Sequence, residues 1–206
     1  PYLKLIQEGT VGTKELDEKV SNILRLIFRT SMNPYKPFGS LASPEHGQAG
    51  RKIGEEGIVL LQNKDNVLPI DLKKARKIAV IGENAIKMMT VGGGSSSLKV
   101  KYEISPLDGL KNRVGSQAEV LYARGYVGDP TGEYNGVQTG QDLKDDRSED
   151  ELLAEAVEVS KDADYVIFFG GLNKSNHQDC EDSDRASLGL PYAQDRVIGE
   201  LAKVNK

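Results

Sequence analysis

The chain has 206 residues, of which 38% are hydrophobic and 28% are charged, as in an ordinary globular domain with a core of its own. Its net charge of −4 argues against a nucleic-acid partner, because phosphate binding needs clustered lysines and arginines. One cysteine and two histidines are too few for a recognisable zinc site, and no run of 18 apolar residues predicts a membrane span. We therefore expect no nucleic acid, no membrane and no metal.

The first predicted element is an amphipathic helix that Thr13 caps and Pro34 ends. Its apolar residues recur at helical spacing, at Val20, Ile23, Leu24 and Ile27. A second helix is predicted from Ser43, the expected N-cap, with Pro44 at the first helical position, where a missing N–H costs nothing. The run "IVLLQN" at 58–63 then predicts a strand.

Three short apolar runs follow, each typical of a strand. The clearest is "IAVI" at 78–81, which Gly82 ends and which predicts a strand buried on both faces. The others are "AEVLYARG" at 118–125 and "YVIFFGG" at 165–171. Helices are expected between and after them, beginning at Ser105, at Ser148 (in a capping box with Glu151) and near Pro191.

This alternation of strands and helices predicts an α/β fold, with a largely parallel sheet covered by helices on both faces in the manner of flavodoxin-like sandwiches. Ligands of such sheets bind at the loops beyond the carboxyl ends of the strands. The loops that carry function are therefore expected at 82–97, 125–147 and 170–190.

The loop "VGGGSSS" at 91–97 does not have the spacing of a phosphate-binding loop. One interpretation is a flexible surface connection. The other is that its glycines permit close approach of the backbone to a ligand or a neighbouring domain, with the hydroxyls of Ser95 and Ser96 as contacts.

The segment "NKSNHQDCEDSDRASLGLP" at 173–191 crowds four acids into six residues, namely Asp179, Glu181, Asp182 and Asp184. They form either a solvated loop or a site in which one carboxyl group donates a proton. A donor near neutral pH needs a raised pKa, which burial or a like-charged neighbour supplies. Arg185 is expected to pair with Asp184 and anchor the loop, while His177 offers a hydrogen-bonding contact.

Five motifs occur in the order seen in the second domain of glycoside hydrolase family 3, and the chain resembles the bacterial β-glucosidases of that family. They are "GEEGIVLLQNKDNVLPI", "KIAVIGENA", "VGGGSS", "ISPLDGL" and "DSDRASLGLPYAQDRVI". The resemblance implies a retaining, exo-acting glycosidase without a cofactor. In that family a barrel aspartate is the nucleophile, and a glutamate of the second domain is the general acid/base.

The acid/base position falls on Glu181, in "CEDSDR". Many relatives have glycine after this glutamate, whereas Asp182 follows it here, so Asp179 remains a rival acid. The resemblance also implies that Ser95 and Ser96 lie near the substrate, a β-linked glucoside or oligosaccharide, and we expect His177 and Asp179 to contact it as well. β-Xylosidase or glucanase activity is an alternative to β-glucosidase activity.

The resemblance also implies a domain organisation. Residues 1–33 correspond to the last helix of a preceding (β/α)₈ barrel, 34–42 to a linker, and 43–206 to an incomplete sandwich domain. We expect the sequence to be part of a longer protein that is periplasmic or secreted, although no leader is visible in it. The alternative is a non-catalytic carbohydrate-binding or scaffold module with the same fold.

Overall fold

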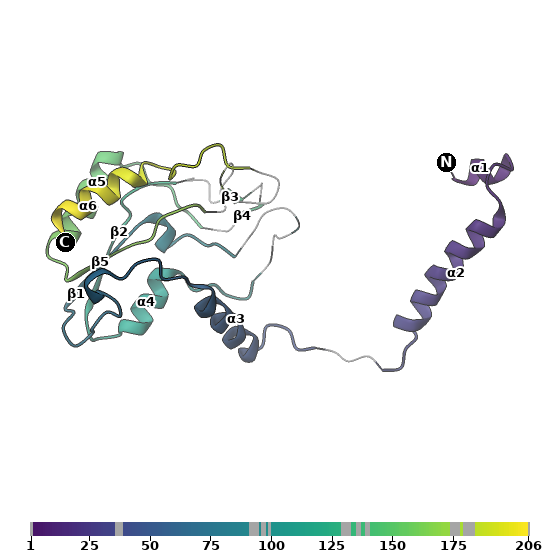
Figure 1. Ribbon diagram of the computed structural model, residues 1–206, viewed down its shortest axis with the longest axis horizontal. Coiled ribbons are helices and arrows are strands. Elements are labelled where there is room, and N and C mark those ends of the chain that lie inside the picture. The colour runs from purple at the N-terminus through teal and green to yellow at the C-terminus, as the bar shows by residue number, and fades with distance from the viewer. Residues whose placement is uncertain are drawn as a thin grey trace. The chain divides into compact units, whose positions relative to one another are not determined.

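The computed structural model describes residues 2–35, 39–90, 95, 98, 100–128, 133–134, 137–138, 141–173, 178 and 184–205. Contacts within the chain divide it into two units, Pro1–Ile58 and Val59–Lys206. The first unit contains helices α1 (Tyr2–Gln7), α2 (Thr13–Thr30) and α3 (Pro44–Gly57). The second unit contains the sheet (Figure 1).

Helix α2 is confirmed, but its predicted N-cap is wrong. Gly12 has the extended backbone of an N-cap, and Thr13 is already the first helical residue, so its hydroxyl does not cap the helix. None of the residues of α2 is buried, and its apolar stripe is 44–59% exposed at Val20, Ile23, Leu24 and Ile27. Helix α3 begins as predicted, because the Ser43 hydroxyl accepts a hydrogen bond from the His46 N–H at 3.4 Å.

The strand predicted at 58–63 is wrong. The segment is irregular, and within the described part of the chain it pairs with no other strand. Its apolar side chains remain exposed, including Ile58, Val59 and Leu61. A strand is stable only beside a partner that accepts its backbone hydrogen bonds, and an apolar run cannot reveal whether that partner is present.

The sheet has three parallel strands, β1 (Lys77–Ile81), β2 (Glu119–Ala123) and β5 (Tyr165–Phe168), in the order β2-β1-β5. This confirms the predicted α/β fold with a parallel sheet. A separate antiparallel pair joins β3 (Glu133–Tyr134) and β4 (Val137–Gln138).

Helices cover both faces of the sheet (Figure 1). Alternate residues of a strand point to opposite faces, so β1 supplies two cores. Ala79 and Ile81 pack with residues of α5 (Glu149–Lys161) and α6 (Gln194–Val204). Ile78 and Val80 pack with residues of α4 (Pro106–Val114) on the other face.

Local capping signals determine where the helices around the sheet begin. The Ser105 hydroxyl accepts from the Asp108 N–H at 3.1 Å, and Ser148 forms the predicted capping box with Glu151. Helix α6 begins at Gln194, three residues after Pro191. The described residues also form the 3₁₀ helices η1 (Lys64–Asn66) and η2 (Glu83–Ala85).

Gly82 ends β1 where the predicted run ends, and its φ of 122° is a conformation that favours glycine. A Cβ at this position would overlap the carbonyl oxygen of Phe169, so only glycine lets the exits of β1 and β5 approach this closely. Among the described helices, none combines the length and the hydrophobicity that a membrane span requires.

Candidate active site at the carboxyl edge of the sheet

Three chain segments leave the carboxyl edge of the sheet side by side, because the strands are parallel and adjacent. They begin at Gly82 after β1, at Arg124 after β2 and at Phe169 after β5. These are the starts of the three loops that the sequence predicts to carry function.

A buried ion cluster, formed by Glu83, Lys87, Arg124 and Asp145, joins two of these segments. The Glu83 side chain is 0% exposed and that of Arg124 is 7% exposed. Arg124 Nη2 lies 2.8 Å from Glu83 Oε2, and Lys87 Nζ lies 3.6 Å from Glu83 Oε1. The Gly128 N–H also donates to Glu83, so this carboxylate links the exits of β1 and β2.

Arg124 also reaches the end of the long loop before α5, because its Nη1 lies 3.4 Å from Asp145 Oδ2. Asp145 pairs at the same time with Arg147, at 2.7 Å. Hydrogen bonds from Arg147, assisted by the charges of Arg147 and Arg124, hold the pKa of the Asp145 carboxyl well below its ordinary value. The loop is therefore tied to the sheet at both ends.

We expect the stability of the protein to depend on the ionisation of Asp145. Since its pKa is lower in the folded chain than in the unfolded chain, its contribution is complete above the ordinary carboxyl pKa and is lost as pH falls below about 4. Urea unfolding at about pH 3 and about pH 7 should show a smaller pH-dependent loss for Asp145→Asn than for wild type.

The matched control is Asp146→Asn, whose carboxylate is 84% exposed and pairs with Lys144 at 3.4 Å. This variant should keep the pH dependence of the wild type. An Asp145→Asn protein that loses as much stability on acidification as the wild type would contradict the expectation.

A stacked pair of tyrosines lies beside the ion cluster. The rings of Tyr126 and Tyr192 are 6.3 Å apart and nearly parallel, at 10°. Burial raises the pKa of the Tyr126 hydroxyl, which therefore stays protonated. This hydroxyl donates to the Phe169 carbonyl at 3.0 Å and accepts from the Asn84 N–H at 3.3 Å. It thus bridges the exits of β1, β2 and β5.

Buried amide side chains hold the exit of β5. Gln194 accepts from the Gly171 N–H at 2.7 Å and donates to the Gly171 carbonyl at 3.1 Å. Asn84 Nδ2 donates to the carbonyls of Gly171 and Leu172, at 3.3 and 3.4 Å. Asn173 Nδ2 in turn donates to Asn84 Oδ1 at 3.4 Å. The chain that enters the acid-rich segment is therefore held by side chains from η2 and α6.

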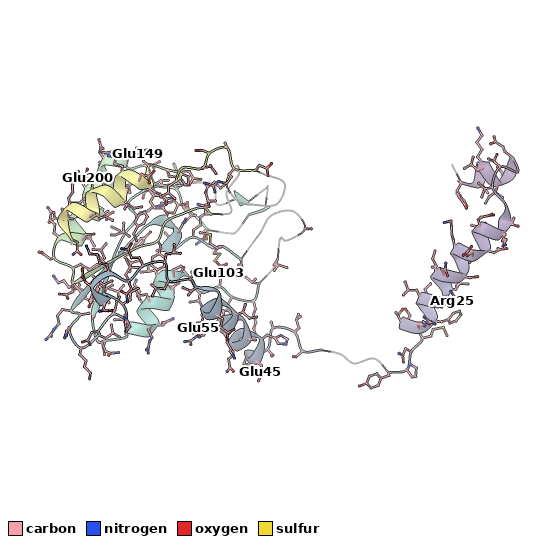
Figure 2. All side chains as sticks on the ribbon, in the orientation of Figure 1. Arg25, Glu45, Glu55, Glu103, Glu149 and Glu200 are labelled. Atoms are coloured by element: carbon pink, nitrogen blue, oxygen red, sulfur yellow. The ribbon has the colours of Figure 1, made fainter. Side chains whose placement is uncertain are left out.

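A shallow pocket of about 140 Å³ lies where the glycine-rich loop begins and ends. Glu103, labelled in Figure 2, accepts from the Met89 N–H and the Thr90 hydroxyl. Gln141 accepts from the Met88 N–H at 2.7 Å and donates to the Ile86 carbonyl at 2.8 Å. The contacts of Glu103 hold the two described ends of the loop together, and those of Gln141 hold the first end against the segment that precedes α5.

The predicted site residues are only partly covered by the structure. Ser95 is described and exposed, as are Asp184 and Arg185. Arg185 Nε donates to the Ser187 carbonyl at 2.9 Å, and its pairing with Asp184 stays a prediction. The remaining predicted positions lie outside the described residues: Ser96, His177, Asp179 and Glu181. In the part that is described, no three histidine, cysteine or acidic side chains gather as metal ligands.

Sequence reasoning missed the ion cluster, although a signal for it exists. Glu83 follows the apolar run of β1 after one glycine, and Arg124 directly follows β2. An acid and a base that leave adjacent parallel strands at the same edge are placed to pair. The buried amides gave no comparable signal, because asparagine and glutamine are common in polar loops.

Comparisons with known proteins show which proteins the chain is similar to. Residues 58–206 match the C-terminal domain of glycosyl hydrolase family 3. A β-glucosidase of Bacteroides ovatus is 44% identical over 100% of this chain, and a periplasmic β-glucosidase of Salmonella typhimurium is 30% identical over 98%. The crystal structure of a GH3 β-glucosidase from Bifidobacterium adolescentis matches 100% of this chain at 28% identity, with a TM-score of 0.75. The chain covers 27%, 28% and 27% of these proteins, about a quarter of their length.

Proposed function

Since the chain belongs to the C-terminal domain family of glycosyl hydrolase family 3, we propose that it supplies the general acid/base of a longer, retaining β-glucosidase. Glu181 is the proposed acid/base. The proposed nucleophile is an aspartate of a preceding barrel domain. The observation that carries the proposal is the 44% identity to a β-glucosidase over the full chain, the acid-rich segment included.

The proposed mechanism needs two carboxyl groups about 5–5.5 Å apart across the glycosidic bond. Glu181 first donates a proton to the oxygen of the departing sugar, while the nucleophile attacks the anomeric carbon. Glu181 then accepts a proton from the water that hydrolyses the covalent glycosyl-enzyme. Proton transfer and one covalent intermediate complete the reaction, so no cofactor is required.

The described edge of the sheet supports this role. A group that transfers a proton must be held at a set distance from the substrate, so the part of the fold that carries it must be rigid. The buried ion cluster fixes the segments that leave β1 and β2, and the buried amides fix the segment that leaves β5. We place Ser95, Ser96, His177 and Asp179 at the substrate, and we assign the anchoring of the loop to Asp184 and Arg185.

The apolar stripe of α2 supports a neighbouring domain, because a helix with one apolar face becomes stable by burying that face. We propose that residues 1–33 contain the last helix of the barrel, that 34–42 form the linker and that 43–206 belong to the sandwich domain.

The periplasmic relative supports a periplasmic or secreted location. The preferred substrate is a β-linked glucoside.

A comparison of the 206-residue chain with the full-length protein tests the proposal. The full-length protein should hydrolyse methyl β-glucoside, whose leaving group adds no glucose of its own, and release β-glucose first, as proton NMR would show, because two displacements at the anomeric carbon retain its configuration. The chain alone should not hydrolyse it, since it carries only one of the two carboxyl groups. An inactive full-length protein that still binds the sugar would favour a non-catalytic module, and α-glucose as the first product would exclude the retaining mechanism.

A further inference from the structure

Gln178 is the one described residue between Asn173 and Asp184, and it is buried, with 7% of its surface exposed. Both ends of its amide are hydrogen-bonded. Its Oε1 accepts from the Asn173 N–H at 3.0 Å, and its Nε2 donates to the Tyr192 hydroxyl. One side chain therefore connects the start of the acid-rich segment to the chain that enters α6.

Both partners of Gln178 are themselves held in place. Asn173 is 2% exposed and donates to Asn84 Oδ1 at the exit of β1. The Tyr192 ring stacks on Tyr126, which is buried. The two partners of Gln178 therefore contact buried residues of the domain core, not surface residues.

The backbone at Tyr192 is a second observation that concerns the same anchor. Its φ is 59°, and that of the next residue, Ala193, is 54°. A bulky residue rarely adopts this left-handed conformation, and it persists only where surrounding contacts impose it. Here those contacts are the stack on Tyr126 and the hydrogen bond to Gln178. Strain of this kind often occurs where a side chain must be aimed for function.

We infer that Gln178 is a positioning residue for the proton transfer assigned to Glu181, an inference that rests on the proposed function. Three residues of chain span at most about 10 Å, so a fixed point at 178 limits where position 181 can lie. Loss of the amide frees the Asn173 N–H and removes that fixed point. We expect the carboxyl group of Glu181 then to lose its alignment with the glycosidic oxygen, whereas the proposed nucleophile of the barrel domain does not depend on this amide.

The test is Gln178→Ala in the full-length enzyme, measured as kcat/KM with two substrates. Cellobiose needs protonation of its leaving group, whereas 2,4-dinitrophenyl β-glucoside does not. We expect kcat/KM for cellobiose to fall by about 10- to 100-fold, and kcat/KM for the aryl glucoside to fall much less. A purely structural role would lower both values equally, in proportion to the folded fraction.

The matched control is Asn205→Ala. The Asn205 amide donates to the carbonyls of Ser160 and Ala163, at 3.1 and 2.7 Å, at the opposite end of α6. This variant loses as many hydrogen bonds, but it should keep the wild-type ratio of the two kcat/KM values. If Gln178→Ala fails to fold, Tyr192→Phe offers a milder change, because it removes the hydrogen bond between Gln178 Nε2 and the Tyr192 hydroxyl and keeps the stacked ring. It should change the ratio of the two kcat/KM values in the same direction.

Failure of the inference and failure of the proposed function give different results. If Glu181→Ala behaves as an acid/base variant but Gln178→Ala and Tyr192→Phe keep the wild-type ratio, the positioning role is overturned and the proposed function stands. An equal fall for both substrates in the Gln178 variant also overturns the positioning role. If Glu181→Ala itself keeps the wild-type ratio, the proposed function fails first.

Discussion

The full-length enzyme with Glu181→Ala should lose most of its kcat/KM for cellobiose and keep much of its kcat/KM for activated aryl glucosides. General acid catalysis contributes about 10²- to 10⁴-fold to a rate, so we expect kcat/KM for cellobiose to fall within that range. The value for 2,4-dinitrophenyl β-glucoside should change far less, because dinitrophenolate departs without a proton. Its kcat should nevertheless fall, since hydrolysis of the glycosyl-enzyme still needs a base.

Asp179→Ala is the control that separates the two candidate acids. It removes a neighbouring carboxyl group from the same segment, two residues away. If Glu181 is the acid/base, Asp179→Ala should lower kcat/KM for both substrates to a similar extent, through sugar binding. A selective loss on cellobiose in the Asp179 variant, with a normal substrate ratio in the Glu181 variant, would transfer the role to Asp179.

Arg124→Met should destabilise the protein more than any substitution of a surface charge. It removes the cation that lies 2.8 Å from the fully buried Glu83 carboxylate, and it leaves that charge with Lys87 at 3.6 Å. Loss of one partner of a buried ion pair costs about 3–5 kcal/mol, because the remaining charge is not solvated. Urea unfolding at neutral pH measures the change in unfolding free energy.

Arg196→Met is the matched control for this prediction. Arg196 pairs with Asp150 through side chains that are 50% and 78% exposed, and such surface pairs contribute little to stability because water screens them. Equal effects of Arg124→Met and Arg196→Met would show that the ion cluster does not stabilise the sheet edge.

The strands of the sheet and the starts of most helices were predictable, because their signals are local. The run 78–81 needs no partner to be recognised as a buried strand, and β1 extends it by one residue. Ser43, Ser105 and Ser148 accept hydrogen bonds from N–H groups only three residues away. Thr13 failed as a cap because the neighbouring Gly12 takes the capping conformation.

The predictions that failed or were missed depend on partners distant in the sequence. Residues 58–63 have the composition of a strand, but no described segment pairs with them. Glu83 and Arg124 are 41 residues apart, and only the strand order brings them together. The points where the three loops of the candidate site leave the sheet were predictable from the parallel sheet alone, whereas the anchor at Gln178 depends on Tyr192, 14 residues later.

The most direct test of the acid/base assignment is the product that the full-length Glu181→Ala enzyme forms in sodium azide. Azide attacks the covalent glycosyl-enzyme without a general base, so it should restore kcat on 2,4-dinitrophenyl β-glucoside. NMR should identify β-glucosyl azide, since two displacements retain the configuration at the anomeric carbon. Unchanged turnover of cellobiose by this variant, with no glucosyl azide formed, would contradict the assignment.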